Sequence, residues 1–183
     1  ANPPIALAAT RQDFDDLPFL DSAGDRQHLA AFLAASQSDC FAVMKDGRLV
    51  YDWFGGFGAA DRQHIVFSIT KSMASLLAGV LVGEGRIDLR RPITDYLPEL
   101  VNSAYAEATM RHLLDMQIAS GFCEDYLDTD GIFMAYRRAS AWNPIEEDDH
   151  NDGLRDFLTK MPASDLAHGT RHHYCSPHSD VLG

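Results

Sequence analysis

The sequence has little positive charge, few cysteines and no long apolar run. It holds 15 lysines and arginines against 27 aspartates and glutamates, which gives a formal net charge of −12. That field repels nucleic-acid backbones and anionic membranes. The three cysteines are odd in number and far apart, which argues against a disulfide framework and against paired metal ligands. No stretch approaches the roughly 20 apolar residues of a membrane span. We therefore expect neither a nucleic-acid nor a membrane partner.

The composition is otherwise that of a globular domain. The chain has 183 residues, of which 46% are hydrophobic and 23% charged, and a domain of this size can bury a real core. Its first ten residues lack the basic leader and the apolar run of a signal peptide. We expect a cytoplasmic protein, or a periplasmic one if a leader was removed before Ala1.

The first third of the chain predicts strands and one helix. Residues 1–22 are rich in proline and acid and suit a surface arm. Residues 23–36 carry apolar side chains at helical spacing. Alternating apolar residues from Phe41 to Trp53 flank Asp46-Gly47, a dipeptide typical of tight hairpins. Residues 65–67 indicate a further short strand.

Helices dominate the remainder. The longest apolar pattern forms one continuous helix face made of Ile69, Met73, Leu76, Leu77, Val80 and Leu81. Gly83 and Gly85 are expected to end that helix. Shorter helices are predicted from Met110 to Gln117, behind the potential cap Thr109, and from Leu154 to Met161 behind Asp152.

Lysine is scarce, and one of the three lysines stands in a chemically suggestive place. Ser68-Ile69-Thr70-Lys71 begins the long helix, so the serine lies at its N-terminus and the lysine one turn along the same face. A serine hydroxyl needs a base within hydrogen-bond reach. A lysine serves when neutral, a form that partial burial and the positive helix end favour. The same end presents the Ser68 N–H to a developing oxyanion. We predict Ser68 as nucleophile and Lys71 as proton acceptor.

A second element lies far along the chain, at Tyr174-Cys175-Ser176. A phenol beside a cationic lysine can relay the serine proton to the leaving group, and Ser176 can hydrogen-bond the lysine or the substrate. We predict Tyr174 as the third catalytic group and Ser176 as a substrate-binding residue. Whether Lys71 or Tyr174 is the immediate base stays open, because strongly coupled groups titrate as a unit.

Each motif also has a plainer interpretation. With twelve serines and three lysines, a chance S-x-x-K is expected roughly 0.2 times. Ser68 alone is compatible with an ordinary N-cap, and Tyr174 with a core or interface tyrosine whose hydroxyl is bonded. An N-cap does not explain a lysine one turn later at the start of a long apolar helix. We therefore favour the catalytic interpretation.

Three segments, in order, resemble the beta-lactamase-related serine hydrolases, which include class C beta-lactamases, D-alanyl-D-alanine carboxypeptidases and many esterases. They are FSITKSMASLLAGVLVGEGRIDLRRPITDYLPEL, TMRHLLDMQIASGF and HGTRHHYCSPHSDVLG, similar to the nucleophile helix, the T-x-R-H-L-L helix and the tyrosine segment of that family. Within the family, LLDM, EDY and HGT…Y-x-S resemble most the 6-aminohexanoate-dimer hydrolases and their esterase relatives. A beta-lactamase would carry Asn in place of Ser176.

The resemblance implies an α/β (α+β) fold of the beta-lactamase type, with an antiparallel sheet flanked by helices and an all-helical lobe. Residues 1–67 would supply the N-terminal arm, a helix and the first strands, and residues 68–183 the nucleophile helix and the helical lobe. It implies hydrolysis of a small amide or ester through an acyl-serine on Ser68, with no metal or organic cofactor. It further implies that a loop tyrosine, Tyr126, closes over the substrate.

One family motif is missing from these residues. The family carries K-T-G or H-x-G on a strand after the tyrosine segment, whereas His168-Gly169-Thr170 precedes Tyr174. The first strands would also leave an open sheet edge. We therefore expect the chain to be incomplete at its C-terminus, with its partner being the remaining strands and C-terminal helix of a longer enzyme. A homodimer is a further possibility.

Two other functions stay open at this point. A beta-lactamase or D-alanyl-D-alanine carboxypeptidase would use the same three groups, and Ser176 in place of Asn counts modestly against it. A non-catalytic binding or sensor module of the same fold would acylate slowly or not at all, and the missing motif favours it to some degree.

Other clusters of residues carry less weight. The histidines around Tyr174 suggest a metal cluster, but no carboxylate or thiolate falls at ligand spacing, so we expect loop histidines and no metal site: His168, His172, His173 and His178. The stretch Gly55-Gly56-Phe57-Gly58 lacks the Lys-Ser/Thr of a phosphate loop and indicates a flexible connection. Cys175 is expected to be a small buried side chain.

Overall fold

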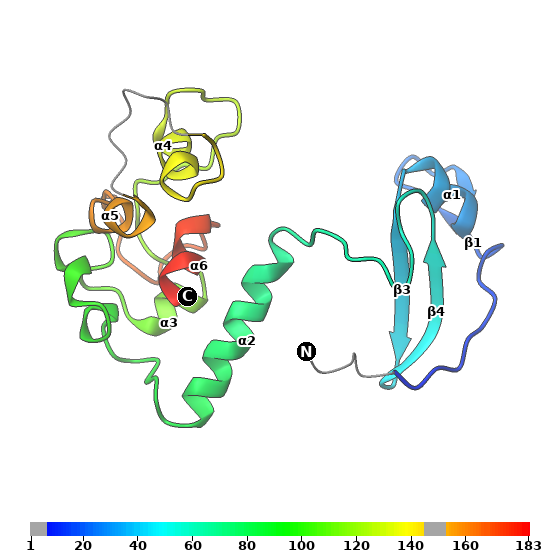
Figure 1. Cartoon of the computed structure of the whole chain (residues 1–183), viewed down its shortest axis with the longest axis horizontal. Coiled ribbons are helices and arrows are strands. Elements are labelled where there is room, and N and C mark those ends of the chain that lie inside the picture. Colours follow the sequence, from blue (N-terminus) through cyan, green and yellow to red (C-terminus); the bar gives the residue numbers. More distant parts are fainter. Residues whose placement is uncertain (1–6, 145–152) are drawn as a thin grey trace. The chain divides into compact units, whose positions relative to one another are not determined.

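The chain forms two compact units, residues 1–65 and 66–183. A computed structural model describes residues 7–144 and 153–183 (Figure 1). All strands of the described residues belong to the first unit, and five of the six α-helices belong to the second. The mixture of small antiparallel sheets and a helical unit agrees with the predicted fold class.

The first unit contains two separate two-stranded antiparallel sheets. Strand β1 (Pro18–Leu20) pairs with β2 (Arg26–His28), and helix α1 (Leu29–Ala35) follows directly. Strand β3 (Cys40–Lys45) pairs with β4 (Arg48–Phe54). The second pair is the hairpin that the alternating apolar residues predict.

The turn of this hairpin is confirmed in detail. Lys45 lies opposite Arg48, so the connection has two residues. Asp46 and Gly47 both have positive φ angles, 52° and 73°, which is the backbone of the tight turn that suits the twist of a hairpin. Aspartate and glycine are among the residues that tolerate this conformation best, which is why the dipeptide predicts the turn.

Two predictions for the first unit are wrong in part. The helix expected over residues 23–36 begins only at Leu29. The Asp21 carboxylate accepts hydrogen bonds from the backbone of Ala23 and Asp25, and such a side-chain-bonded turn competes with helix formation. The arm expected over residues 1–22 is not simply a surface arm, because Thr10 donates to the carbonyl of Leu49 in β4.

The glycine stretch after β4 is a bonded turn and not the flexible connection we expected. Asp39 accepts from the backbone of Gly55 and Phe57 and from His64 Nε2, the last at 2.8 Å. A Cβ on Gly58 would lie 1.7 Å from the carbonyl oxygen of Asp39. Glycine is therefore required at this close approach of two backbone segments.

The strand predicted at residues 65–67 is absent. Phe67 has a φ of 41°, a left-handed conformation that an extended strand excludes. Helix α2 (Ile69–Gly83) follows at once. Its predicted end is confirmed: Gly85 has a φ of 70°, and the backbone N–H groups of Gly85 and Arg86 donate to Val82 and Leu81. These two bonds form a Schellman motif, for which glycine is the usual residue.

Most of the large apolar side chains of helix α2 are exposed. Ala78 is the buried residue of this helix, and α2 contacts helix α6 (Ser176–Leu182). Five residues of the apolar face identified in the sequence are more than half exposed: Ile69, Met73, Leu76, Leu77 and Val80. The apolar pattern correctly predicts a helix, but it does not indicate which face contacts the rest of the second unit.

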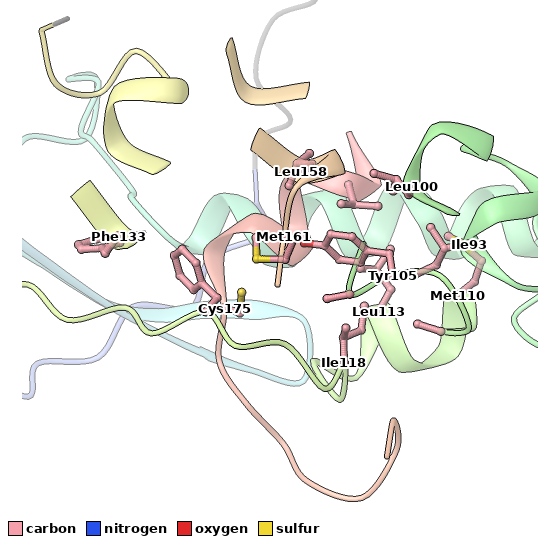
Figure 2. Packing of buried hydrophobic residues seen from close by; sticks show 14 residues of the cluster. Ile93, Leu100, Tyr105, Met110, Leu113, Ile118, Phe133, Leu158, Met161 and Cys175 are labelled. Carbon is pink, nitrogen blue, oxygen red and sulfur yellow. The ribbon is translucent and has the colours of Figure 1, made fainter. Parts of the chain in front are cut away.

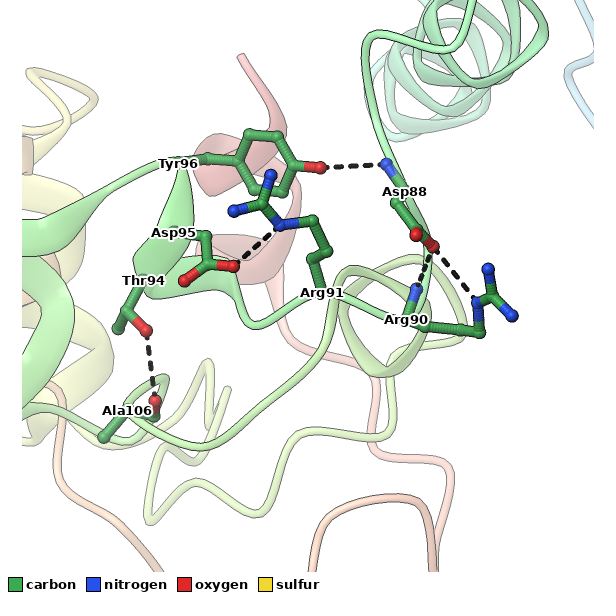
Figure 3. Close-up of polar contacts among 7 residues, drawn as sticks. All are labelled: Asp88, Arg90, Arg91, Thr94, Asp95, Tyr96 and Ala106. Atoms are coloured by element: carbon green, nitrogen blue, oxygen red, sulfur yellow. Dashed lines mark hydrogen bonds and ion pairs between the residues drawn. The ribbon is translucent and has the colours of Figure 1, made fainter.

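The segment after α2 turns back through two short 3-10 helices, η1 (Ile93–Asp95) and η2 (Pro98–Asn102). Figure 3 shows the polar contacts that hold this turn: the Asp88 backbone N–H donates to the Tyr96 hydroxyl at 2.8 Å, and Arg91 Nε donates to Asp95 at 2.8 Å. These contacts bring Ile93, which is fully buried, into the core.

The second unit has a continuous core, shown in Figure 2. Its buried members come from the 3-10 helices, from α3 (Met110–Leu114), α4 (Ile132–Ala139), α5 (Gly153–Thr159) and α6, and from the loops between them. The Thr109 cap is confirmed, because its hydroxyl accepts from the His112 backbone, although α3 ends before Gln117. Helix α5 lies at the predicted place but ends at Thr159 and not at Met161, and the expected cap Asp152 lies outside the described residues.

Candidate active site

Ser68 caps helix α2 with its backbone but not with its side chain. It stands at the N-cap, and its hydroxyl makes no capping hydrogen bond. The hydroxyl instead accepts from Lys71 Nζ at 2.9 Å and from the Tyr174 hydroxyl at 2.8 Å. The plainer interpretation of Ser68 as a side-chain cap therefore does not describe this residue.

Local sequence explains two of the three positions. Lys71 lies one turn after Ser68, so both side chains share a face of α2. The left-handed Phe67 turns the chain sharply just before the serine. Strained backbone of this kind is common next to reactive residues. Together these features place the hydroxyl at the exposed start of the helix with the amine beside it.

Tyr174 arrives from 106 positions further along the chain. Its backbone neighbours are anchored on both sides: His173 N–H donates to the carbonyl of Met116 at 2.7 Å, and helix α6 begins at Ser176. The phenol ring also lies over the lysine, with Nζ 5.5 Å from the ring centroid. Because α6 packs on α2, the tyrosine segment is brought to the serine by contacts within one unit.

This arrangement is chemically suited to proton transfer. The Ser68 oxygen accepts two hydrogen bonds, so both neighbours lie within the distance at which either can take the serine proton. The geometry brings the three predicted residues into contact, and their catalytic roles stay a prediction.

The start of α2 leaves one backbone donor available. The N–H groups of Ile69 and Thr70 donate to the carbonyls of Val66 and Phe67. Within residues 7–144 and 153–183, the Ser68 N–H has no such partner. A backbone N–H in this position is the kind of donor that stabilises an oxyanion, and that role for Ser68 stays a prediction.

Glu124 joins this site and was not identified from the sequence. Its carboxylate accepts from the Ser176 backbone N–H and hydroxyl, both at 3.1 Å, and from the Tyr126 hydroxyl at 2.8 Å. The one available signal was its place in the EDY segment, two positions before Tyr126. Sequence reasoning missed it because its partner Ser176 is 52 positions away.

The two predicted substrate-binding residues therefore share one carboxylate. Ser176 is buried, and its hydroxyl is bonded to Glu124 and not to Lys71. Tyr126 is 70% exposed and its ring meets Phe133 edge-on, with centroids 4.6 Å apart. The hydrogen bond to Glu124 is the main cause that raises the pKa of Tyr126. Substrate binding by either residue stays a prediction.

Two buried or half-buried polar groups belong to the segment that follows Tyr174. Burial raises the pKa of Asp180, against the opposing effects of the Tyr136 hydroxyl, which donates to it at 2.7 Å, and of nearby Lys71. Cys175 is fully buried, as predicted, and burial raises the pKa of its thiol to about 12. A thiol in this state is inert as a nucleophile.

The histidines have structural contacts. His168 Nδ1 accepts from the Ala119 backbone N–H at 3.0 Å, and its ring stacks on His112. His178 is fully buried beside the Tyr105 hydroxyl, and burial lowers its pKa to about 4. Among the described residues, no three His, Cys, Asp or Glu side chains are grouped so as to hold a metal ion.

Comparison with known proteins settles the family. Residues 26–183 match the model of the Beta-lactamase family. The chain belongs to the beta-lactamase family. It is also 33% identical, over 146 residues and 79% of its length, to the 6-aminohexanoate-dimer hydrolase of Paenarthrobacter ureafaciens.

Two solved structures agree with the fold. A Bacillus anthracis protein described as a 6-aminohexanoate-dimer hydrolase superposes with a TM-score of 0.81 over 97% of this chain, at 23% identity. A penicillin-binding-protein homologue from Caulobacter crescentus superposes with a TM-score of 0.51 over 78% of the chain, at 25% identity. The family match and the Paenarthrobacter relative confirm the resemblance seen in the sequence, and the solved structures confirm its fold.

The chain spans less than half the length of these relatives. It covers 36% of the Paenarthrobacter enzyme, 47% of the Bacillus protein and 36% of the Caulobacter protein. Among the described helices, none combines the length and the apolar character that crossing a membrane requires.

Proposed function

We propose that this beta-lactamase-family chain carries the nucleophile of a serine hydrolase that cleaves small amides or esters through an acyl-serine on Ser68. The observation that supports it most is that the Ser68 oxygen lies 2.9 Å from the Lys71 amine and 2.8 Å from the Tyr174 phenol. The similarity to 6-aminohexanoate-dimer hydrolase supports the choice of small amides and esters.

The reaction then proceeds in two steps. The Ser68 oxygen attacks the substrate carbonyl carbon while its proton passes to Lys71 or Tyr174, and the Ser68 N–H stabilises the oxyanion. The same proton is delivered to the departing amine or alcohol as its bond to the carbonyl carbon breaks. Water attacks the acyl-serine in the second step, returns the proton to Ser68 and releases the acid.

Covalent labelling tests this proposal directly. A fluorophosphonate probe followed by intact-mass measurement should add one label to the chain and none to Ser68→Ala. Ser72→Ala is the matched control, because Ser72 is an exposed serine on the same helix, and it should label like the wild type. An unlabelled wild type, or label that persists in Ser68→Ala, would contradict the nucleophile assignment and favour a non-catalytic module.

A second candidate, hydrolysis of beta-lactams or of D-alanyl-D-alanine peptides, is favoured by the likeness to the penicillin-binding-protein homologue. Ser176 counts modestly against this second candidate, because a beta-lactamase would carry Asn at this position. Turnover of a short-chain p-nitrophenyl ester, an aminohexanoate oligomer and a chromogenic cephalosporin should be compared. We expect the first two to react faster, and fast cephalosporin hydrolysis would reverse this ranking.

A further inference from the structure

Glu124 is the acceptor that joins the loop of Tyr126 to the segment of Tyr174. Three of its hydrogen bonds are present in the structure: two from Ser176, through the backbone N–H and the hydroxyl, and one from Tyr126. A carboxylate has about four acceptor sites, so it can hold several donors at once. No other side chain of the described residues bonds to both segments in this way.

The position of Tyr174 depends on its backbone. The tyrosine is 41% exposed, so burial holds its ring only in part. Just before Tyr174, the His173 N–H donates to the carbonyl of Met116. Two residues after Tyr174, the Ser176 N–H donates to Glu124. Loss of the second anchor would leave the Tyr174 hydroxyl free to move away from Ser68.

The Ser176 donors have little alternative to Glu124. Ser176 is 7% exposed, and a buried donor that loses its acceptor is strongly unfavourable. The Ser176 hydroxyl and the Ser176 N–H each donate to a different oxygen of the Glu124 carboxylate. An amide in place of the carboxylate would turn one of these oxygens into an NH₂ group that faces a donor.

We propose that Glu124 is a positioning residue for acylation: by accepting from Ser176 and Tyr126 it holds the Tyr174 phenol against Ser68. This inference rests on the proposed function, because it concerns the rate at which Ser68 is acylated. Glu124 does not itself need to touch the reacting atoms. Its carboxylate acts through the backbone that carries Tyr174, by accepting from the Ser176 N–H two residues further along.

The test compares fluorophosphonate labelling rates of Glu124→Gln, Glu124→Asp and Asp125→Asn. Glu124→Gln should lower the limiting labelling rate by on the order of 10- to 100-fold, with little change in the half-saturating probe concentration. Glu124→Asp keeps the carboxylate and should recover part of the rate. Asp125→Asn removes the same charge one residue away, keeps the oxygen that accepts from Leu127, and should label within about twofold of wild type.

A spectroscopic readout tests the contact without reference to Ser68. The pKa of Tyr126 is obtained from tyrosinate absorbance, as the difference between each protein and its Tyr126→Phe partner. Glu124→Gln should lower this pKa, because the hydrogen bond to the carboxylate is the largest cause of its elevation. Asp125→Asn should leave the pKa of Tyr126 close to its wild-type value. A variant that only lowers the stability of the fold would not lower the pKa of Tyr126, so the difference between the two variants reports on the contact with Glu124.

The outcomes separate the two proposals. If wild type is labelled at Ser68 and Glu124→Gln keeps its rate within about twofold, the inference is overturned and the proposed function stands. If Glu124→Gln slows labelling but Glu124→Asp does not recover it, a carboxylate is not what positions Tyr174, and the inference is also overturned. If wild type is not labelled while the Tyr126 shift is observed, the contact exists but both the function and this role are wrong.

Discussion

The two compact units of this chain are held together in different ways. The first unit has only two buried apolar side chains among its described residues, Leu33 and Tyr51, and its loops are fastened by polar contacts such as those of Asp39. The second unit has a continuous core of 14 buried residues. The three candidate catalytic side chains all belong to the unit with the core. A proton-transfer geometry needs rigid support, and close packing supplies it.

The largest expected effect tests whether the chemistry belongs to the second unit. Lys71→Met should slow fluorophosphonate labelling of Ser68 by on the order of 10²- to 10⁴-fold, because it removes a proton acceptor. Lys45→Met is the matched control, since Lys45 is an exposed lysine of β3 in the first unit, and it should label normally. If Lys45→Met slowed labelling as much as Lys71→Met, the chemistry would not belong to the second unit alone.

Matched leucine truncations compare the two cores. Leu113 in the second unit is 1% exposed and Leu33 in the first is 5% exposed. Leu113→Ala should lower the free energy of unfolding by about 2–5 kcal/mol, and Leu33→Ala by less, because its sparser surroundings can relax around the cavity. Urea unfolding followed by tryptophan fluorescence measures both free energies of unfolding. Trp142 reports on the second unit and Trp53 reports on the first. A larger cost for Leu33→Ala would invert the comparison.

Two glycine substitutions should differ in sign. Gly58→Ala places a Cβ 1.7 Å from the Asp39 carbonyl oxygen, so the first unit should lose about 1–3 kcal/mol of stability. Gly79→Ala, in the interior of α2, meets nothing within 4 Å and should stabilise the helix by up to about 1 kcal/mol. Thermal unfolding gives both values, and a destabilised Gly79→Ala would mean that this face of α2 is covered.

The smallest expected effect is a pH dependence of the first unit. The hydrogen bond to Asp39 raises the pKa of His64, and the same bond lowers the pKa of Asp39. The histidine contribution is complete below the unfolded pKa of about 6.5 and is lost as pH rises through the elevated folded pKa. The aspartate contribution is present above about 3.9 and is lost as pH falls through the lowered folded pKa.

The measurement is the urea midpoint of Trp53 fluorescence, in a Trp142→Phe background, from pH 4 to pH 9. Wild type should be most stable between about pH 3.9 and about pH 6.5, where both contributions are present, and should lose stability as the pH rises above neutrality. His64→Gln should show a flatter profile in that range. A wild-type midpoint that rises from pH 6 to pH 9 would contradict the charged pair.

Sequence patterns predicted the parts of the fold that depend on neighbouring residues. The Asp46-Gly47 turn, the Thr109 cap and the glycine end of α2 are all confirmed, because each rests on bonds between residues a few positions apart. The helix over residues 23–36 was too long because the Asp21 turn competes with it. The strand at residues 65–67 was wrong because no partner strand pairs with it among the described residues, and Phe67 adopts a left-handed turn.

The sequence by itself determined the family and the chemical identity of the candidate site. Ser68 and Lys71 are three positions apart, so helix periodicity alone puts them on one face, and the tyrosine segment is distinctive enough to be recognised. Only the tertiary structure decided that the Tyr174 hydroxyl meets Ser68, that Glu124 holds Ser176 and Tyr126, and that most of the large apolar residues of α2 are exposed. The physical reason is separation along the chain: contacts across 52 or 106 positions form only when a whole unit folds, and no local pattern encodes them.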